Sequence, residues 1–555
     1  MPTLNWIGKD AVINHHNDVP FRVLDKKYTF GDVADTSQCG VSTENKIIHG
    51  DNLEALKALL PEYEGRIKCI YIDPPYNTGN ENWKYNDNVN SPKIRKWLGQ
   101  VVGKEAEDLT RHDKWLCMMY PRLVLLKKLL ADDGAIFISI DDNEQANLKL
   151  ICDEIFGAGN LISCSIRRTI NSGKHDVTTI APFHEYLLVY AKEITKVQIE
   201  KKQKCSNEKD RLYKLTDEFV NLRGRYYITQ LNKNSLQYSD GLNYPIIGPD
   251  GIDIWPGGGF EDKVWIWRWS KEKVEWGIQN GYIVFKKTKE GNYKVYTKSY
   301  EFVDKDGNFI VRNNPYSSLE YVAKEYANFN ATPELEKIFN GSKVFSFPKS
   351  ILFIEEILKM IDTKDSIILD SFAGSGTTAH AVLNLNKADG GNRKFILVEM
   401  EDYAETITAE RVRRVINGYG EGKNAVEGTG GSFSFYELGE TIFNGDGYLN
   451  ESVGTAKLRE YIWYTETRTP LPHATVETGR APSLPQYLLG NHDGTAYYFY
   501  YEPDQITTLS HETLSIVVQK AETYVVYADQ CVIDEEWLSS HNIVFKKIPR
   551  DIRKF

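Results

Sequence analysis

The sequence predicts an α/β fold in which a largely parallel sheet is covered by helices. Residues 45–160 and 343–416 alternate short apolar runs with segments whose apolar residues recur at helical spacing. The stretch between them loses this rhythm and carries short aromatic-rich pieces. A chain of 555 residues has room for roughly three or four domains. Its composition, 41% hydrophobic and 26% charged residues, is ordinary for a globular protein.

The first α/β stretch contains strand and helix signals in regular order. The predicted elements are a strand and helix in 45–61, a strand at 66–72, a helix in 113–134, a strand at 135–141 and a helix in 144–156. The first helix is expected to stop at Pro61, because proline has no backbone N–H. Asp142 and Gln145 form a candidate capping box for the last helix.

The middle and the end of the chain are predicted to form separate modules. "HEYLLVYAK" (184–192) is one further strand. The alternating tryptophans of "VWIWRWS" (264–270) predict a strand whose aromatic face either builds a small core or stacks on bases. The α/β pattern then returns in 343–416, and "EGTGGSFSF" (427–435) is expected to be a linker to an acidic module, 436–555.

The stretch "YIDPPYNTG" (71–79) places polar groups directly after a predicted buried strand. Pro74 and Pro75 lack N–H groups and must end the strand, so Asp73 lies at its carboxyl end, where open α/β sheets bind their ligands. A carboxylate, a fixed carbonyl and the ring of Tyr76 suit a planar ligand with an amino group. The alternative is an ordinary proline-rich turn.

The stretch "LDSFAGSGTTA" (369–379) follows a predicted strand and opens a predicted helix. Gly374, Gly376 and Ala379 fit a G-x-G-x-x-G/A pattern, which allows a ligand to approach the backbone closely. Glu399 ends the next strand, where an acid can accept hydrogen bonds from ribose hydroxyls. These features fit any adenosine-containing cofactor, NAD included, and a purely structural turn is the alternative.

The order of these two motifs resembles that of the β-class amino-methyltransferases of DNA. Further segments, among them "IIHGDNLEAL", "DKWLCMMYPRL", "HEYLLVYAK", "FPKS" and "IPRDI", are similar to modification subunits of type III restriction–modification systems. The resemblance implies a circularly permuted Rossmann-like methyltransferase domain that uses S-adenosyl-L-methionine, with an inserted target recognition domain and a C-terminal accessory domain.

The resemblance also implies roles for individual residues. The catalytic residues would be Asp73, Pro74, Pro75 and Tyr76. Asp73 and the Pro74 carbonyl would accept the hydrogens of the target amino group, and Tyr76 would stack on the flipped base. The cofactor-binding residues would be Asp51, Lys349, Asp370, Phe372, Ala373, Gly374, Gly376, Thr377 and Glu399. Among these, Asp51 would lie near the adenine of the cofactor and Lys349 near its methionine end.

The expected domains follow from the same resemblance. They are an N-terminal arm (1–44), the catalytic half (45–160), the target recognition domain (161–340, with a strand near 184–192 that could join the catalytic sheet), the cofactor-binding half (341–426) and a dimerisation or partner-binding domain (436–555). Arg167, Arg168 and Lys174 are predicted to lie in a loop that contacts DNA. An exposed basic loop without that role is the alternative.

Charge and cysteine usage are consistent with this interpretation. The net charge is −10, but residues 421–555 carry 19 acidic and 11 basic side chains, whereas 161–230 carry 13 basic and 8 acidic ones. Seven scattered cysteines without a CxxC pair argue against a zinc site or a disulfide framework, and we expect no metal. No signal-peptide pattern or apolar run of about 18 residues is present, so a cytoplasmic protein is expected.

The sequence therefore predicts an adenine-specific DNA methyltransferase. An Asp before "PPY" is, in the resembling family, more often associated with N6 of adenine than with N4 of cytosine. The expected partners are double-stranded DNA, a second copy of the chain and a restriction (helicase-nuclease) subunit. The alternatives are an N4-cytosine enzyme, an orphan methyltransferase without a nuclease, an RNA or protein methyltransferase, an NAD-dependent oxidoreductase and a non-catalytic specificity protein.

Overall fold

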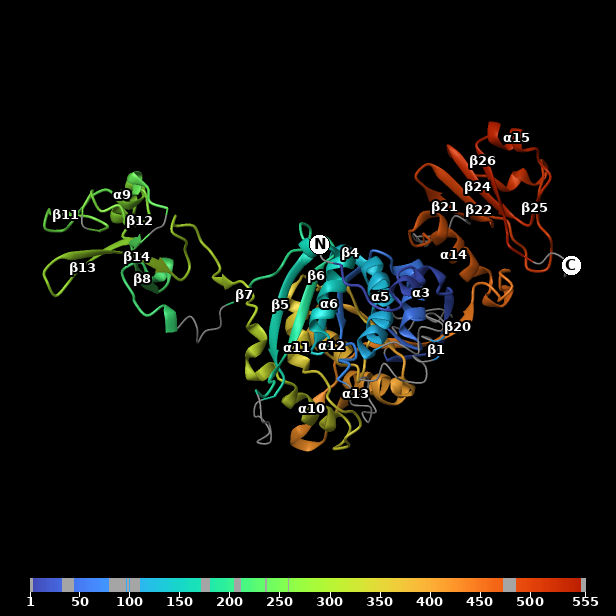
Figure 1. Ribbon diagram of the computed structural model, residues 1–555, viewed down its shortest axis with the longest axis horizontal. Coiled ribbons are helices and arrows are strands. Elements are labelled where there is room, and N and C mark those ends of the chain that lie inside the picture. Colours follow the sequence, from blue (N-terminus) through green and yellow to red (C-terminus); the bar gives the residue numbers. More distant parts are fainter. Residues whose placement is uncertain are drawn as a thin grey trace. The chain divides into compact units, whose positions relative to one another are not determined.

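The chain forms two compact units, shown in Figure 1. The computed structural model describes residues 3–31, 44–78, 96, 99, 110–170, 180–203, 211–234, 237–257, 259–472 and 486–550. The first unit comprises Met1–Glu200 together with Ser317–Phe555, and the second comprises Lys201–Tyr316.

The first unit is built on a mixed sheet that, in the described part of the chain, has nine strands. In spatial order these are β1 (Arg22–Gly31), β20 (Ser432–Thr441), β2 (Lys46–His49), β17 (Lys394–Glu399), β16 (Ile367–Asp370), β3 (Ile67–Ile72), β4 (Leu130–Ile140), β6 (His184–Ala191) and β5 (Leu161–Arg168). The strands from β20 to β4 run parallel, and antiparallel neighbours flank them: β1 on one edge, β6 and β5 on the other.

Helices cover both faces of this sheet. On one face, Ile70 and Ile72 of β3 share a buried core with α3 (Asn52–Tyr63), α5 (Arg111–Leu129) and α6 (Gln145–Cys152). The intervening Tyr71 points to the other face and packs edge-on against Phe353. The helices on this second face are α11 (Ile351–Met360), α12 (Thr377–Asp389) and α13 (Glu410–Asn417).

The neighbouring strands β3 and β16 form the point at which the sheet reverses its order. From β3 the chain passes through α5 to β4, whereas from β16 it passes through α12 to β17 on the opposite side. Right-handed crossovers that run in opposite directions place their helices on opposite faces. A crevice therefore opens at the carboxyl ends of β3 and β16, where both sequence motifs begin.

Several predicted elements differ in extent from those observed. Helix α3 includes Pro61 and ends at Tyr63, because a proline in the last turn removes a single hydrogen bond without stopping the helix. The predicted capping box of α6 is absent: its N-cap is Glu144, and Asp142 accepts a hydrogen bond from Tyr186 instead.

Three segments that were assigned outside the catalytic sheet belong to it. β1 comes from the predicted N-terminal arm, β5 from the start of the predicted recognition domain, and β20 begins in the predicted linker 427–435. In β20, Phe433 to Tyr436 are all buried, and the strand pairs in parallel with β2. The linker prediction is therefore wrong for Ser432–Phe435.

The second unit contains a small antiparallel sheet in the order β13 (Ile283–Lys287), β14 (Tyr293–Tyr300) and β8 (Tyr226–Gln230). Helix α9 (Lys271–Gln279) and the pair β9 (Asn232–Asn234) and β12 (Trp265–Trp267) accompany it. Trp267 is buried in its core and Trp269 packs against that core, whereas Trp265 is 36% exposed. The tryptophan stretch thus serves mainly as core, one of the two predicted uses.

The acidic C-terminal segment has a sheet of its own within the first unit. Its strands are β21 (Leu488–His492), β22 (Thr495–Phe499), β24 (Thr523–Ala528) and β26 (Ile543–Lys547), with helices α14 (Thr455–Thr467) and α15 (Glu535–Ser540). Short elements elsewhere are α1 (Lys9–Val12), α2 (His15–Asp18), β7 (Lys202–Gln203), α8 (Val220–Arg223), β10 (Ile246–Ile247), β11 (Asp253–Ile254), β15 (Asn313–Asn314), α10 (Ala331–Ile338), β18 (Gly418–Tyr419), β19 (Val426–Glu427), β23 (Thr508–Leu509) and β25 (Gln530–Cys531). No helix in the described ranges is both long and apolar enough to cross a membrane.

Candidate active site

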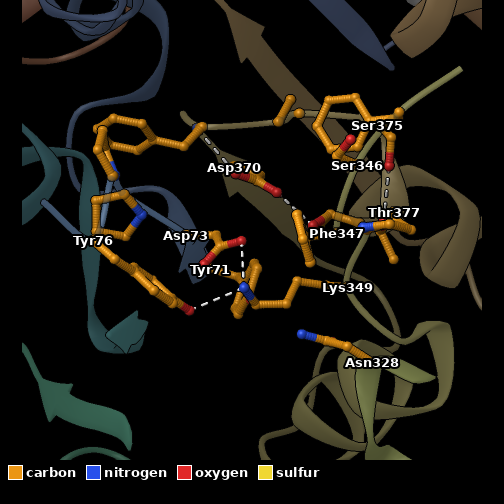
Figure 2. A pocket seen from close by; sticks show the side chains of 18 of the residues that line it. Tyr71, Asp73, Tyr76, Asn328, Ser346, Phe347, Lys349, Asp370, Ser375 and Thr377 are labelled. Atoms are coloured by element: carbon orange, nitrogen blue, oxygen red, sulfur yellow. Dashed lines mark hydrogen bonds and ion pairs between the residues drawn. The ribbon is translucent and has the colours of Figure 1, made fainter. Parts of the chain in front are cut away.

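A cavity of about 310 Å3 lies at the switch point between β3 and β16. Its walls come from the ends of these strands, from β6 and from the loop before α11. The lining residues are Tyr71, Asp73, Pro74, Pro75, Tyr76, Thr78, Thr169, Glu185, Asn328, Phe345, Ser346, Phe347, Pro348, Lys349, Asp370, Phe372, Ala373, Gly374, Ser375, Thr377 and Thr378 (Figure 2). The two motifs, nearly 300 residues apart in the sequence, thus face one space.

Asp73 follows β3 and points into this cavity. Its Oδ2 forms an ion pair with Lys349 Nζ at 2.6 Å (Figure 2). Its Oδ1 is also buried, and none of the described residues donates a hydrogen bond to it. Burial raises the pKa of Asp73 above its ordinary value, and Lys349 opposes this effect. Asp73 thus has one buried acceptor oxygen to which none of the described residues donates a hydrogen bond.

Tyr76 lies beside Asp73 with its ring on the cavity wall. The hydroxyl donates to Glu185 Oε2 at 3.0 Å and accepts from Lys349 Nζ at 2.9 Å. The Nζ of Lys349 also lies 4.9 Å from the centre of the Tyr76 ring. Burial raises the pKa of Tyr76 well above its ordinary value, so the phenol stays neutral at physiological pH.

Glu185 and Arg167 are site residues that sequence reasoning missed or misplaced. Glu185 on β6 is buried and pairs with Arg167, which lies on β5 and is itself fully buried. Arg167 also donates to the Tyr326 carbonyl at 2.8 Å and lies 4.1 Å from the Phe353 ring. Its prediction as a loop residue that contacts DNA is wrong, because its charge is satisfied inside the protein.

The other two predicted DNA contacts have different outcomes. Arg168 ends strand β5 rather than lying in a loop, and its Nε donates to the Val322 carbonyl at 2.9 Å. Its side chain is partly exposed, so a contact with DNA stays a prediction. Lys174 lies outside the described residues.

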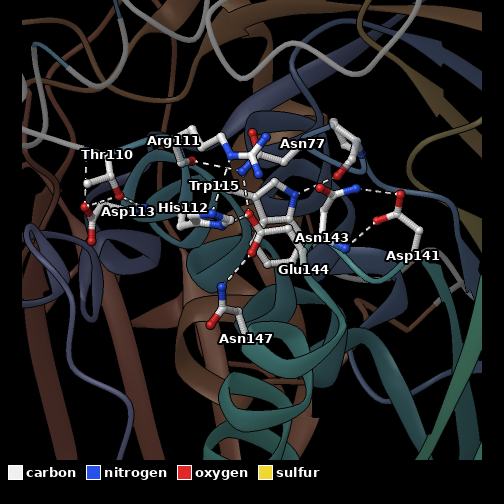
Figure 3. Close-up of polar contacts among 11 residues, drawn as sticks. Asn77, Thr110, Arg111, His112, Asp113, Trp115, Asp141, Asn143, Glu144 and Asn147 are labelled. Atoms are coloured by element: carbon white, nitrogen blue, oxygen red, sulfur yellow. Dashed lines mark hydrogen bonds and ion pairs between the residues drawn. The ribbon is translucent and has the colours of Figure 1, made fainter. Parts of the chain in front are cut away.

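The turn that carries Pro74 and Pro75 is held from behind by a polar cluster (Figure 3). Trp115 Nε1 donates to the Pro75 carbonyl at 2.7 Å. Asn77 adopts a left-handed conformation, with φ of 57°, and its amide donates to the buried Glu144 carboxylate. Glu144 also binds His112 Nδ1 at 2.7 Å. Because Trp115 occupies the Pro75 carbonyl, the backbone orientation of the whole turn is fixed.

The glycine turn after β16 adopts the conformation that its glycines permit. Gly374 and Gly376 have positive φ values of 51° and 80°. The Gly374 N–H donates to Glu399 Oε2 at 2.8 Å, and the Glu401 N–H donates to Glu399 Oε1 at 2.9 Å. Burial raises the pKa of Glu399 to about 7. The buried Arg411 supports the turn by donating to Ser375 Oγ at 2.9 Å, a role that its helical sequence context did not reveal.

The remaining predicted cofactor residues occupy distinct places. Phe372, Ala373 and Thr377 line the cavity, whereas Gly376 heads α12 just outside its lining. Asp370 accepts hydrogen bonds from the Phe372 N–H at 3.0 Å and from Thr378 Oγ1 at 2.5 Å. Burial raises the pKa of Asp370 to about 7. Asp370 therefore links the start of the glycine turn to the first turn of α12.

Asp51 and Glu399 lie near a second, smaller cavity. Asp51 caps α3, where its Oδ1 accepts from the Leu53 N–H at 2.8 Å, and it does not line the main cavity. Its ion-pair partner Arg122, at 3.4 Å, lines the small cavity together with Glu399. Pro75 and Phe372 line both cavities. Within the described residues, no cluster of three or more His, Cys, Asp or Glu side chains has the geometry of a metal site.

Comparison with known proteins gives this site a family. A family model described as "DNA methylase" matches residues 67–410, more than half of the chain. The chain is 35% identical over 371 residues to the type II methyltransferase M.KpnI of Klebsiella pneumoniae, covering 64% of this chain and 81% of that protein. It is 31% identical over 442 residues to the Mod subunit of the type III restriction-modification enzyme EcoPI of Escherichia phage P1.

The extent of these matches differs. The EcoPI match covers 72% of this chain, and the chain spans 64% of the length of that Mod subunit. The crystal structure of an M1.HpyAVI–SAM complex covers 66% of the chain at 14% identity and a TM-score of 0.28, too low to indicate a shared activity. The match to the family model spans Asp73, Tyr76, the glycine turn and Glu399. The chain therefore belongs to the DNA methylase family.

Proposed function

We propose that the chain transfers a methyl group from S-adenosyl-L-methionine to N6 of a flipped-out adenine in double-stranded DNA. The observation that carries this proposal is the shared cavity of the two motifs, lined by Asp73 and Tyr76 on one wall and by the Gly374 turn on another. The similarity to the Mod subunit of EcoPI supports a role as the modification subunit of a type III restriction–modification system.

The residues of the glycine turn fit the proposed cofactor. Gly374 lines the cavity, and Gly376 is packed closely at the start of α12, where a Cβ would lie 3.1 Å from the Thr408 carbonyl oxygen. Glu399 keeps lone pairs that can accept ribose hydroxyls beyond its two backbone contacts. Phe372 and Gly374 would lie against the cofactor, which supplies an electrophilic methyl group when bound.

Asp73 and the Pro74 carbonyl would hold the target amino group. The exocyclic nitrogen of adenine is a weak nucleophile, because its lone pair is delocalised into the ring. Two acceptors that bind both N–H groups would favour a pyramidal nitrogen with its lone pair directed at the methyl group. Trp115 Nε1 donates to the Pro75 carbonyl behind the turn, and we assign the Pro74 carbonyl as the second acceptor.

The target base must leave the duplex to reach this cavity, since the acceptors are recessed below the protein surface. Tyr76 offers a ring on the cavity wall that would replace part of the stacking lost by the flipped base. We assign sequence recognition to the second unit, Lys201–Tyr316, which lies between the two motifs in the chain. Residues 436–555 would mediate dimerisation or bind a restriction subunit. Because the proposed substrate is DNA, we propose that the protein acts in the cytoplasm.

Nucleoside analysis tests this proposal directly. The purified chain is incubated with S-adenosyl-L-methionine and unmethylated bacterial genomic DNA, and the digested nucleosides are measured by mass spectrometry against a no-enzyme control. We expect N6-methyladenine. Detection of N4-methylcytosine instead would identify cytosine as the target base. Methylation of competing RNA but not of DNA would identify RNA as the substrate. Binding of NADH in preference to S-adenosyl-L-methionine would contradict the cofactor assignment.

A further inference from the structure

A continuous chain of partly buried polar contacts crosses the wall of the cavity behind Asp73. It runs from Asp73 Oδ2 to Lys349 Nζ at 2.6 Å, to the Tyr76 hydroxyl at 2.9 Å, to Glu185 Oε2 at 3.0 Å and on to Arg167. These residues come from four separate segments: the loop after β3, the loop before α11, β6 and β5. Figure 2 shows Lys349 between Asp73 and Tyr76.

The two cations of this chain have different freedom. Arg167 is committed elsewhere: it pairs with Glu185, donates to the Tyr326 carbonyl and to Asn328 Oδ1 at 2.5 Å, and is fully buried. Lys349 is the cation, among the residues that the structure describes, that forms an ion pair with Asp73. Its side chain is 10% exposed. If Lys349 is removed, bulk water therefore has little access to solvate the Asp73 carboxylate in its place.

We propose that Lys349 is a positioning residue that keeps Asp73 ionised and holds its carboxylate in place to accept from the target amino group. Glu185 and Arg167 hold Lys349 and Tyr76 in that arrangement. This inference rests on the proposed function and differs from the sequence prediction, which places Lys349 at the methionine end of the cofactor.

The charges around Asp73 explain why Lys349 is needed. The groups that face Asp73 are Lys349 from the loop before α11, Glu185 from β6, Asp370 from β16, Tyr71 from β3 and Tyr76 from its own loop, and Arg167 from β5 acts on Tyr71 and Tyr76. Burial and the negative charge of Glu185 raise the pKa of Asp73, and Lys349 lowers it. Without Lys349, Asp73 would lose its ion-pair partner, whereas Glu185 would keep its contact with Arg167.

One of the two carboxylates would then bind a proton. Glu185 retains its direct contact with Arg167, so Asp73 is the carboxylate that becomes protonated. A protonated Asp73 donates a hydrogen bond with one oxygen and is a weaker acceptor with the other. The target nitrogen would lose the charge-assisted acceptor that stabilises its developing positive charge.

The dependence of the methylation rate on pH tests this role. The full chain and its Lys349→Met, Lys349→Arg and Glu185→Gln variants are assayed under single-turnover conditions, on a duplex whose site is taken from sequencing of methylated DNA. For Lys349→Met we expect the acidic limb of the rate profile to move up by about one to three pH units, so that alkaline pH restores activity in part. Lys349→Arg keeps the charge and should leave the limb in place even if the rate falls.

Glu185→Gln removes a negative charge that raises the pKa of Asp73, so its acidic limb should move down. Opposite shifts in Lys349→Met and Glu185→Gln are not expected from a merely structural defect, which lowers the rate at every pH. Lys359→Met is the matched control, because Lys359 lies exposed on the adjoining helix α11 with a side chain 47% accessible. Its profile should match the wild type. If Lys349→Met does not fold, as judged by circular dichroism, the Lys349→Arg and Glu185→Gln pair decides.

Binding of S-adenosylhomocysteine, measured by calorimetry, separates the two roles of Lys349. We expect the Kd of Lys349→Met to stay within about twofold of the wild type. A large rise in Kd with an unshifted pH profile would assign Lys349 to the cofactor and overturn the inference. If the wild type methylates a duplex but the variants keep its acidic limb, the inference alone fails. If the wild type methylates no DNA, the proposed function fails and the inference with it.

Discussion

Asp73 has one oxygen bound to Lys349 and a second, buried oxygen to which none of the described residues donates a hydrogen bond, and we propose that its carboxylate accepts from the target amino group. In Asp73→Asn the shape is retained, but the charge is lost and an amide donor can face the cavity. We expect methyl transfer to fall by at least about 100-fold in a single-turnover assay. The Kd for S-adenosylhomocysteine should stay within about twofold.

Asp133→Asn is the control for this change. Asp133 also pairs with a lysine, Lys68, but its side chain is 55% exposed and lies outside the main cavity. Its methylation rate should equal that of the wild type. If Asp73→Asn weakened S-adenosylhomocysteine binding as strongly as it slowed methyl transfer, Asp73 would maintain the shape of the cavity rather than bind the target.

Tyr76 combines a ring and a hydroxyl, and the two can be separated by substitution. Tyr76→Phe keeps the ring but leaves Glu185 Oε2 without its donor at 3.0 Å, a loss of about 1–3 kcal/mol in unfolding free energy. Tyr76→Ala also removes the stacking surface, so we expect a larger loss of transfer on duplex DNA than with Phe. Equal rates for Phe and Ala would place the function of Tyr76 in its hydroxyl rather than in its ring.

Sequence reasoning found the site residues that belong to a short motif and missed those that do not. Asp73, Tyr76, Phe372 and Gly374 stand in two recognisable stretches, and all four line the cavity. Glu185 is a single acid in an apolar strand, and its partner Arg167 is 18 residues away. No local spacing predicts that antiparallel pairing of β5 with β6 brings these two charges together behind Tyr76.

At the scale of elements, helix α12 is flanked by two glycines of positive φ, its N-cap Gly376 and its C-cap Gly390. Substitutions at these two positions can be compared directly. Gly376 has φ of 80°, and a Cβ there would meet the Thr408 carbonyl oxygen at 3.1 Å, whereas Gly390 has φ of 65° and open space around it. Alanine costs about 1–2 kcal/mol at either position because of the left-handed backbone.

Only Gly376→Ala should also displace the glycine turn. We expect it to weaken S-adenosylhomocysteine binding by about tenfold or more, and Gly390→Ala to leave the Kd unchanged, in calorimetry at one temperature. Thermal melts of both variants report the shared backbone cost. Equal Kd values in the two variants would mean that the turn tolerates a shift and is not the cofactor cradle.

The parallel strands at the centre of the sheet were predictable from local sequence pattern, but the edge formed by β1 and β20 was not. β3 and β16 are short apolar runs that end in a motif, and α12 follows a glycine turn. β1 and β20 pair across some 400 residues of sequence, as in the Thr29–Ser434 hydroxyl contact at 2.8 Å. The glycines before β20 indicated a linker, although Phe433 and Phe435 already carried the alternating pattern of a strand.

At the scale of the whole molecule, the loss of α/β rhythm after residue 160 predicted a change of architecture, but its position is later. β5 and β6 return to the catalytic sheet, and the second compact unit begins at Lys201 and ends at Tyr316. β6 is antiparallel to both β4 and β5, and antiparallel strands need no crossover helix between them. The alternation of strand and helix therefore stops in the sequence before the last strands of the sheet have been formed.

The stability of the folded chain should depend on two buried acids at the cofactor side of the cavity. Burial raises the pKa of Asp370 from 3.8 and of Glu399 from 4.5 to about 7. Between the unfolded and folded values, the folded chain holds protons that the unfolded chain has released. The stabilisation from each acid is therefore complete below the unfolded pKa and is lost as pH rises through the folded pKa. It amounts to roughly 3–4 kcal/mol per acid at most.

Urea unfolding at pH 5 and pH 8, followed by circular dichroism, measures this effect. We expect Asp370→Asn and Glu399→Gln each to reduce the loss of unfolding free energy between these pH values. The comparison is with the wild type, because His16, whose pKa burial lowers to about 4, changes stability in the opposite direction as pH rises. Glu421→Gln, at an exposed position, is the control and should keep the wild-type slope. Wild-type slopes in both site variants would show that Asp370 and Glu399 are ionised in the folded chain at neutral pH, held so by the backbone N–H groups of Phe372, Gly374 and Glu401.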